Sequence, residues 1–380
     1  MRTVPLSVPD SMKRLGALLP AFEKRAQSHD TTDQFVLENY TALKQARVMS
    51  LPIPKELGGQ GCELSELADV LRRMGAVCGS TALAFSMHLQ TVAALVWHWK
   101  THGAPVASVL QRIAEEQLGI ATSNGSDWLG SSGSAKRTRG GFKVDANKKI
   151  ISGSPGSDLL ATSGIYRDPI AGPTVLHFLA PLSAPEIIID SSWRAMGMRG
   201  TGSNTVAIKG FFVPDGLIVA RRPQGVWHDL YHAAIMLAMP LIYSVYLGIA
   251  EAAHALAIES TRRRPHTSTL VDLAGTMEMD LCTARMAVND MLAAATESPG
   301  PQTTSRIFIG RSLAANGAIA AVEKAFELIG APGFMRGHPI ERMFRDVQAA
   351  RFHPGGPVPA RAFAGLTALG LPIDKSQSEK

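Results

Sequence analysis

The stretch WRAMGMRGTGSNTVAIKGFFVP, residues 193–214, contains a glycine-rich segment followed directly by an apolar segment. Its first half is rich in glycine, and its second half is a short apolar run that ends in a proline. The segment Gly200-Thr201-Gly202-Ser203-Asn204-Thr205 lacks the third glycine of a dinucleotide-binding loop and leads into a predicted strand, not a helix. Proline is typical of a strand end. We therefore predict a glycine-rich turn followed by the strand that closes a β domain.

The residues before this stretch predict the rest of that β domain. Runs of four to eight residues, each bounded by turn residues, are typical of strands: DLLATSGIY, TVLHFLAPL and EIIID. GFKVDANKKIISG (141–153) opens as a strand, and we expect a polar turn at Asp145-Ala146-Asn147. We predict an antiparallel β-barrel or sandwich over residues 119–222.

Both flanking regions have the apolar periodicity of helices. Residues 1–118 predict an N-terminal helical domain, which includes a long apolar helix from Ser80 to Trp99 with His88, Gln90 and His98 embedded in it. Residues 223–380 predict a C-terminal four-helix bundle. Its helices are expected at 228–263, 268–297, 303–330, 338–352 and 357–369. The fold class is therefore a multidomain α+β protein in the order helical, β, helical.

One apolar run has the length of a membrane span. Ala233 to Ala250 carries no charged residue over 18 positions. It contains Pro240, Ser244 and Gly248 and continues into a charged amphipathic helix, so we predict a buried central helix and no membrane span.

Composition limits the classes of function. Apolar residues make up 46% of the 380 residues and charged residues 18%, which is enough to bury a large core. The net charge of +6 fits an anionic ligand as well as nucleic acid, but no basic stripe with interleaved aromatics is present, so nucleic acid is not expected. The three cysteines lie far apart without a CxxC pair, and no secretory signal precedes them. These features predict reduced thiols in a cytoplasmic protein.

A metal site is not predicted. His228 and His232 are spaced i, i+4 but lack a third ligand, so we interpret them as a helix-start cluster. Nucleophilic catalysis also lacks a motif, because there is no GxSxG and no cysteine in a catalytic pattern.

Two segments could bind phosphate. Thr261-Arg262-Arg263-Arg264-Pro265 either places favourable charge at a helix end or clamps a pyrophosphate or a 3′-phosphate through the planar guanidinium groups. Gly330-Ala331-Pro332-Gly333 is either a plain turn between helices or a loop that lets phosphates approach closely.

Four stretches in order resemble the acyl-CoA dehydrogenase superfamily. LPIPKELGGQG (51–61) is similar to the family's loop between early helices, and residues 193–214 closely resemble its segment "GMR…S…V.F…VP". GIAEAAHALAIESTRRR (248–264) resembles the helix that ends in a flavin-contacting arginine. ELIGAPGF…HPIERMFRDVQ resembles the stretch that folds over the flavin pyrophosphate of a neighbouring subunit. The resemblance covers about residues 50–370.

The resemblance implies a bound FAD, or FMN, and a homodimer or homotetramer with shared sites. The positions that match its cofactor-binding residues are Ala121, Thr122, Ser123, Ile151, Ser152, Arg264, Gly330, Ala331 and Gly333. Arg199 and Ser203 match the "MR…S" motif and, with His88, are the candidates for substrate contact. For His88 the alternative is a satisfied histidine of the core. The flavin-facing segments depart from the family pattern: residues 123–127 form a shortened SNGSD run, and Ile150 stands where an aromatic usually stacks.

The resemblance also implies a small-molecule substrate, an acyl-CoA thioester or similar. Removal of its α-proton needs a carboxylate within hydrogen-bond reach. The usual glutamate position holds Pro354, in the run His353-Pro354-Gly355-Gly356, and the alternative position falls near Ala238. Neither residue is an acid.

Three functions follow. Dehydrogenation of an acyl thioester is the main interpretation, with Glu251, Asp229 or another acid as base and an electron-transfer partner. The alternative is a flavin-dependent monooxygenase that acts on a small organic substrate and is supplied by a flavin reductase. In that branch histidines near the flavin assist oxygen transfer, and His353 and His88 are candidates; His353 could equally be a helix C-cap. The third is a non-catalytic flavin-binding or assembly subunit.

Overall fold

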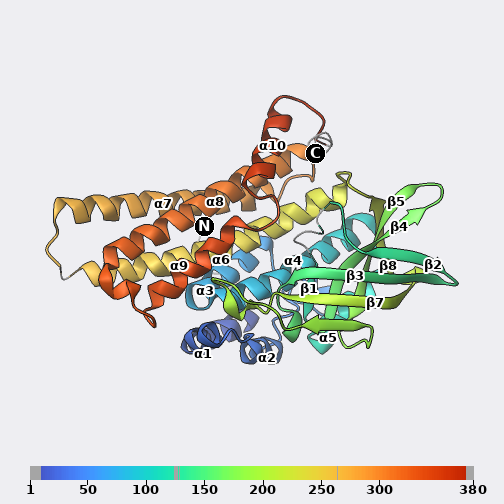
Figure 1. Ribbon diagram of the computed structural model, residues 1–380, viewed down its shortest axis with the longest axis horizontal. Helices are drawn as coiled ribbons and strands as arrows, with labels where there is room; N and C mark the ends of the chain where they lie inside the picture. Colours follow the sequence, from blue (N-terminus) through green and yellow to red (C-terminus); the bar gives the residue numbers. More distant parts are fainter. Residues whose placement is uncertain (1–9, 124–126, 128, 263, 374–380) are drawn as a thin grey trace, which may run out of the picture.

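The computed structural model describes residues 10–123, 127, 129–262 and 264–373. In this part of the chain a helical region precedes a sheet and a second helical region follows it (Figure 1). The predicted order helical, β, helical is confirmed. The first helices are α1 (Asp10–Thr32), α2 (Leu37–Gln45), α3 (Leu64–Val77), α4 (Gly79–His102) and α5 (Ala107–Glu116). The strands are β1 (Ile120–Thr122), β2 (Ser134–Thr138), β3 (Gly141–Ile151), β4 (Leu159–Asp168), β5 (Gly172–Pro181), β6 (Ile187–Asp190), β7 (Asn204–Pro214) and β8 (Ile218–Pro223). The last helices are α6 (Asp229–Thr261), α7 (Ser268–Ala294), α8 (Pro301–Ile329), α9 (Pro339–Val347) and α10 (Pro357–Ala368).

The strands form one mixed sheet. Its order is β6-β7-β3-β2-β4-β5-β8, with β1 also paired to β4. Most pairs are antiparallel as predicted, but β1 and β2 each run parallel to β4. Parallel strands need a connection longer than a hairpin, and the chain between β1 and β4 supplies it by forming the β2–β3 hairpin.

The predicted turn at Asp145-Ala146-Asn147 is wrong. Strand β3 continues through these residues, and its register against β7 shifts between Val144 and Ala146. A β-bulge of this kind absorbs an extra polar residue without ending the strand. The Asp145 carboxylate there accepts a 2.8 Å hydrogen bond from the backbone N–H of Gly210.

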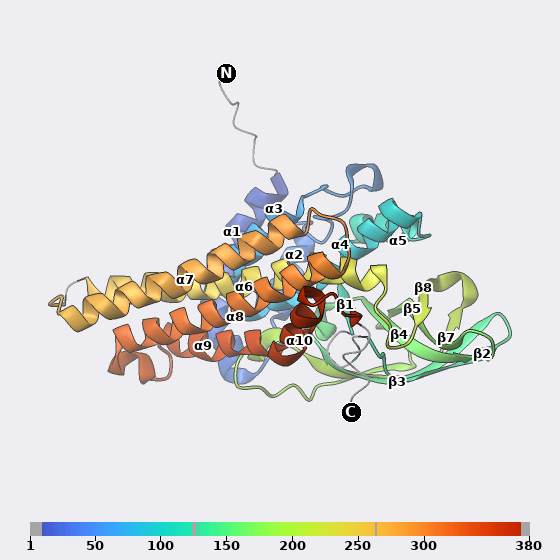
Figure 2. The same cartoon turned by 90° about the horizontal axis from the view of Figure 1, so that it is seen from above.

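Helix α6 is the centre of the helical part. Helices α3, α4, α7 and α8 all pack on it, and Figure 2 shows α7 and α8 lying along its length. Helices α4 and α6 are long and apolar enough to cross a membrane, but 78% and 89% of their most apolar windows are buried within the protein. The prediction of a buried central helix is therefore confirmed.

Two glycines allow α3 and α6 to approach closely. A Cβ at Gly248 would lie 1.9 Å from the Arg72 carbonyl oxygen, and one at Gly75 would lie 2.4 Å from the Val245 carbonyl oxygen. Any side chain at either position would push the helices apart, because the neighbour is backbone.

The run His353-Pro354-Gly355-Gly356 ends the turn that follows α9, residues Gln348–Arg351. Buried Arg311 of α8 donates hydrogen bonds of 3.2–3.3 Å to the carbonyls of Ala350, Arg351 and His353. These carbonyls at the end of the turn therefore have a hydrogen-bond partner from another helix. Gly355 has φ +69°, and a Cβ there would lie 2.3 Å from the Phe308 ring.

Candidate functional site

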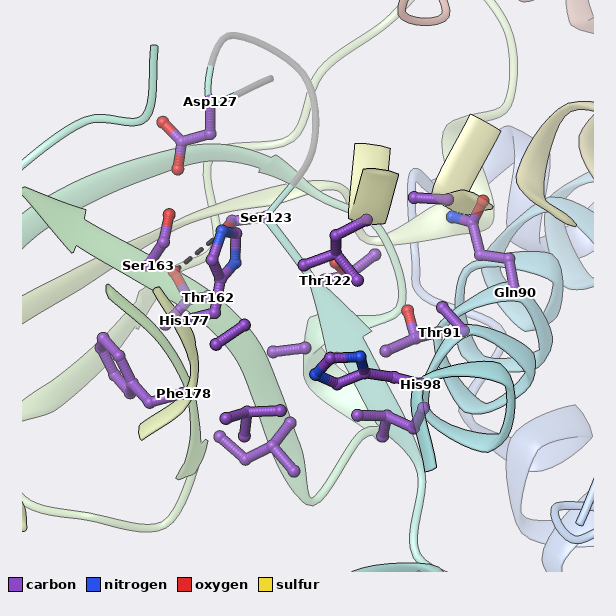
Figure 3. A pocket seen from close by; sticks show the side chains of 18 of the residues that line it. Gln90, Thr91, His98, Thr122, Ser123, Asp127, Thr162, Ser163, His177 and Phe178 are labelled. Carbon is purple, nitrogen blue, oxygen red and sulfur yellow. Dashed lines mark hydrogen bonds between the residues drawn. The ribbon is translucent and has the colours of Figure 1, made fainter. Parts of the chain in front are cut away.

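A cavity of about 170 Å³ lies where α4 and the start of α6 face the sheet (Figure 3). Strands β1, β4, β5 and β8 form its other wall. Most of the lining is apolar, so a ligand's polar atoms would meet only a few partners. Its apolar lining residues are Ala94, Leu95, Ala161, Phe178, Leu179, Val219, Ala220, Leu230, Ala234 and Ala238.

One face of helix α4 lines the cavity and carries two of its polar side chains, Gln90 and His98. Gln90, Ala94 and His98 line it at four-residue spacing, which places them on one face of the helix. The Gln90 carbonyl oxygen has no hydrogen-bond partner among the described residues, although the side chain is only 4% exposed. The His98 ring hydrogen-bonds the Val219 carbonyl, and burial is the main cause that lowers the pKa of His98.

Strands β1 and β4 present a wall of hydroxyl groups. Thr122 and Ser123 lie at the end of β1, and Thr162 and Ser163 lie on β4 beside them. The Ser123 and Thr162 hydroxyls are 2.9 Å apart, and the Thr122 hydroxyl has no hydrogen-bond partner in the described chain. The parallel pairing of β1 with β4 brings these four side chains together.

One carboxylate lines the cavity among the residues that the structure describes, and it is ion-paired. Asp127 contacts the ammonium of Lys148, whose side chain is fully buried on β3. Lys148 also donates to the Ser132 carbonyl at 2.8 Å. Burial lowers the pKa of Lys148, while Asp127 favours its charged form. A buried ion pair of this type is not available as a base, because separating it would leave a charge without compensation.

A second buried cation lies behind the opposite wall. Arg222 of β8 is 2% exposed and donates to His177 Nε2 at 3.1 Å and to the Tyr231 hydroxyl. Both of these partners line the cavity. Burial, followed by the charge of Arg222, lowers the pKa of His177 to about 3, and burial raises the pKa of Tyr231 to about 12. Both side chains are therefore uncharged at neutral pH.

The residues predicted to bind flavin divide into two groups in space. Thr122 and Ser123 line the cavity, whereas Ala121 and Ile151 are fully buried in the sheet core. The buried Ser152 hydroxyl is 2.8 Å from that of Ser203, outside the cavity lining.

The second group lies at the other end of α6. Arg264 donates to the Leu328 carbonyl at the end of α8, next to the loop that holds Gly330, Ala331 and Gly333. Ala238 lines the cavity and Thr261 ends α6, so about 35 Å of helix separates the two groups within one chain, at about 1.5 Å per residue.

The substrate-contact candidates do not line the cavity. His88 is fully buried, its Nε2 donates to the Met49 carbonyl at 2.7 Å, and its Nδ1 accepts from the Ile120 N–H at 3.0 Å. It is the satisfied core histidine of the alternative interpretation, and it anchors the start of β1. Arg199 lies 3.6 Å from Asp33, and the Ser203 hydroxyl lies 2.7 Å from that of Thr201.

The two candidates for catalysis also lie elsewhere. The carboxylate of Glu251 is held by Arg72 at 2.7 Å and Arg285 at 3.1 Å. The His353 ring hydrogen-bonds the Tyr246 hydroxyl, and burial lowers the pKa of His353 to about 3. Neither side chain lines the cavity, so the structure offers no support for either as the base.

The described residues contain no cluster of three or more potential metal ligands. His228 caps α6 by accepting from the Leu230 N–H at 3.2 Å, and His232 hydrogen-bonds Thr304 at 2.6 Å. These contacts match the predicted helix-start cluster.

The sequence analysis predicted Thr122 and Ser123 but assigned no role in the site to the other polar residues of the cavity. Gln90 and His98 were visible as polar residues two turns apart on an apolar helix, which is a signal for one shared face. His177 and Lys148 gave no comparable signal, since each is defined by a partner on another strand or loop.

The hydroxyl wall fits the hydrogen-bonding edge of a flavin ring. Such a ring needs donors and acceptors near its nitrogens and carbonyls, and the unpartnered Thr122 hydroxyl and the neighbouring Ser123 hydroxyl can supply them. Arg264 and the glycine loop suit a phosphate group, but they lie too far away to reach the same molecule from the same chain.

Comparisons with known proteins agree with this arrangement. Residues 20–104 match the acyl-CoA dehydrogenase N-terminal domain family and residues 241–355 its C-terminal domain family. The amino sugar nitrososynthase DnmZ of Streptomyces peucetius is 25% identical over 357 residues, covering 88% of this chain and 87% of that protein. The oxygenase subunit HsaA of a flavin-dependent monooxygenase from Rhodococcus jostii is 25% identical over 398 residues, covering 95% and 99%.

A solved structure shows the same fold. The structure of KijD3 in complex with FMN and a dTDP-linked amino keto sugar superposes with a TM-score of 0.88 at 23% identity, covering 97% of each chain. The predicted FAD or FMN cofactor agrees with these relatives. The chain belongs to the acyl-CoA dehydrogenase superfamily of flavin-dependent oxidoreductases, as its four sequence motifs predict.

Proposed function

We propose that this protein is the oxygenase component of a two-component flavin-dependent monooxygenase. The observation that carries this proposal is the cavity lining. Among the described residues, its one carboxylate, Asp127, is ion-paired with buried Lys148. Dehydrogenation of a thioester needs a free carboxylate to remove the α-proton, whereas oxygen transfer does not need one.

The relatives favour this alternative over the dehydrogenase interpretation. One is named as a nitrososynthase and another as the oxygenase subunit of a flavin-dependent monooxygenase. A relative named as a putative acyl-CoA dehydrogenase, from Bacillus subtilis, is 24% identical over 367 residues, so the family alone does not decide the reaction.

The proposed reaction transfers one atom of O₂ to a small organic substrate. The second oxygen atom leaves as water, and a reduced flavin, FMN or FAD delivered by a separate reductase, supplies the two electrons and the activation of O₂. Thr122 and Ser123 hold the ring edge through their hydroxyls. Ala94, Leu179 and Ala234 belong to the apolar lining, which keeps bulk water from the reacting atoms.

The proposed enzyme is a homodimer or homotetramer in the cytoplasm. About 35 Å of α6 separates the hydroxyl wall from Arg264 and the glycine loop. The arginine and loop of one copy therefore complete the cofactor site of another copy, which fits flavin binding between subunits.

A single set of measurements tests the reaction. The purified protein is loaded with photoreduced FMN without oxygen and then mixed with aerated buffer, while the absorbance of oxidised flavin is followed. We expect the oxidised absorbance to return more slowly than for free reduced FMN, and substrate screens in ¹⁸O₂ with a flavin reductase to give a product containing one labelled atom.

Other outcomes would identify the competing functions. Bleaching of the FAD-loaded protein by a short or medium acyl-CoA in the absence of oxygen would establish a dehydrogenase and overturn the proposal. A protein that retains neither FMN nor FAD, in oxidised or reduced form, would indicate a non-catalytic assembly subunit.

A further inference from the structure

Arg222 fixes the position of the proton on the His177 ring. Every nitrogen of an arginine side chain is a donor, so the 3.1 Å contact from Arg222 Nε requires His177 Nε2 to be the acceptor. A neutral imidazole that accepts at Nε2 carries its proton at Nδ1. Burial and the neighbouring positive charge both keep the ring neutral. His177 is therefore a hydrogen-bond donor of fixed orientation.

The donating edge of this ring is available to a ligand. His177 lines the cavity, and no acceptor for its Nδ1–H lies among the described residues. Figure 3 shows the His177 ring entering the cavity from the sheet, opposite the His98 ring on α4. Tyr231 packs edge-on against the His177 ring at a centroid distance of 6.5 Å, which limits its rotation.

The charges around this donor disfavour a cation. Arg222 lies directly behind His177 from β8, and Lys148 on β3 and His228 at the start of α6 also act to lower its pKa. Asp127, from the loop after β1, is the carboxylate in the lining, and its charge is offset by Lys148. His98 on α4 and Tyr231 on α6 are neutral neighbours.

We propose that the His177 Nδ1–H binds the acceptor oxygen of the substrate, and that the cavity selects uncharged molecules carrying a carbonyl or hydroxyl oxygen, in preference to protonated amines. This inference rests on the monooxygenase proposal and names its substrate class. The cavity of about 170 Å³ is shared between the flavin edge at the hydroxyl wall and the substrate, so a small substrate is expected.

His177 stands at the edge of the hydroxyl wall. It pairs with Ser163 of β4 on one side and with Ala220 of β8 on the other, and Tyr231 at the start of α6 packs against its ring. Thr122 and Ser123, which hold the flavin edge in the proposed function, lie one strand further away, beside β4. The donor of His177 is therefore assigned to the substrate, and the measurement on the FMN-loaded protein distinguishes the substrate from the flavin.

Binding of three probes of similar shape tests the proposal. Benzamide carries a carbonyl acceptor, toluene carries none, and benzylamine is protonated at neutral pH. Dissociation constants are measured by calorimetry or competition on the full-length protein, first flavin-free and then loaded with oxidised FMN. We expect benzamide to bind about tenfold more tightly than toluene in both forms, the effect of one hydrogen bond, and benzylamine to bind most weakly.

Two variants of His177 test whether this residue causes the preference for benzamide. His177→Asn keeps an N–H near the position of Nδ1 and should retain most of the preference for benzamide, whereas His177→Leu should abolish it. Imidazole ¹⁵N spectra of the wild-type protein should show His177 as the Nδ1–H tautomer, a reading that does not depend on the folding of any variant.

Three results would overturn the inference. They are equal binding of benzamide and toluene, preferred binding of benzylamine, or an Nε2–H tautomer for His177. A benzamide preference that vanishes in the FMN-loaded protein, together with weaker FMN binding by His177→Leu, would assign the donor to the flavin instead. Because no turnover is measured, each of these results leaves the monooxygenase proposal to its own test.

Discussion

The carboxylate of Asp346 accepts a 2.5 Å hydrogen bond from the backbone N–H of Met198. Met198 has φ 54°, a left-handed conformation that is uncommon for a residue with a side chain. The neighbouring Gly197 packs directly on α9, since a Cβ there would lie 2.2 Å from the Arg345 carbonyl oxygen. The turn that precedes β7 is thus held in place by the Arg-Asp pair of α9, almost 150 residues further along the chain.

Replacing Asp346 with alanine should destabilise the protein. The buried Met198 N–H would lose its acceptor, and hydrogen bonds to charged groups contribute about 1.5–3 kcal/mol. Asp346→Asn keeps an acceptor oxygen and should cost less. The free energy of unfolding, measured in urea at neutral pH, checks both values. An alanine variant as stable as the wild type would show that the turn does not need this hydrogen bond.

The raised pKa of Asp346 should make the stability of the protein depend on pH. Burial, opposed by the Met198 N–H, raises the pKa of Asp346 to about 6, so the folded protein holds this proton more tightly than the unfolded chain does. The part of the stability that comes from this bound proton is therefore fully present below about pH 4 and is lost as the pH rises through about 6, whereas the hydrogen bond from the Met198 N–H remains. The difference in urea midpoint between the wild type and Asp346→Asn should change across this window. A constant difference would contradict the shifted pKa.

His88 should act on stability and not on substrate binding. His88→Phe fills the same space but leaves the Met49 carbonyl and the Ile120 N–H unsatisfied in the core. A loss of about 2–4 kcal/mol in the free energy of unfolding is expected for two such groups. Benzamide binding by the folded fraction should remain within about threefold of wild type. A variant of normal stability that loses ligand binding would restore the substrate role of His88.

Substitutions of Asp127 and Lys148 should have strongly non-additive effects on the free energy of unfolding. Lys148→Met leaves a buried carboxylate without its cation and should cost about 3–5 kcal/mol of folding free energy. Asp127→Asn combined with Lys148→Met removes both charges and should recover much of that loss. Denaturation of the two single variants and the double variant completes the cycle. Additive costs would mean that the two side chains are not coupled.

Arg264→Ala should weaken flavin retention. The adjacent Arg262 pairs at 2.9 Å with exposed Glu259, so Arg262→Ala is a matched control that should retain flavin. Flavin content after gel filtration gives the first reading. Mixed oligomers of Arg264→Ala with Thr122→Val should regain part of the binding that each variant loses alone, because one site per pair would be intact. No recovery in mixed oligomers would contradict a site shared between copies.

Much of the fold could be predicted from the sequence because it depends on local patterns. The five C-terminal helices lie within a few residues of the predicted ranges, and Ala233–Ala250 is the buried core helix that its lack of charge indicated. The turn at Asp145-Ala146-Asn147 was wrong because polar residues at a bulge have the composition of a turn. The parallel pairing of β1 with β4 depends on a connection that no local pattern reveals.

The site was predicted less well, for a physical reason. Thr122 and Ser123 were found through the resemblance, and both line the cavity. His177 is ordinary in its own strand, and its role depends on Arg222 in the neighbouring strand. In the sequence, Lys148 and Lys149 look like a pair of solvated lysines, but in the structure Lys148 is buried and ion-paired with Asp127. These roles depend on contacts between side chains on different strands and loops, and a single sequence does not show which side chains meet.

Ala234 and Ala238 lie one turn apart on α6, and both face the cavity. The most apolar part of this helix is 89% buried, and α3, α4, α7 and α8 pack on it, which opposes a shift of α6 to make room for a ligand. The small methyl side chains of Ala234 and Ala238 therefore leave space on the α6 side of the cavity. Each methyl group added at these positions would remove a portion of that space without disturbing a hydrogen bond. A family of such enzymes could change its substrates there one carbon atom at a time.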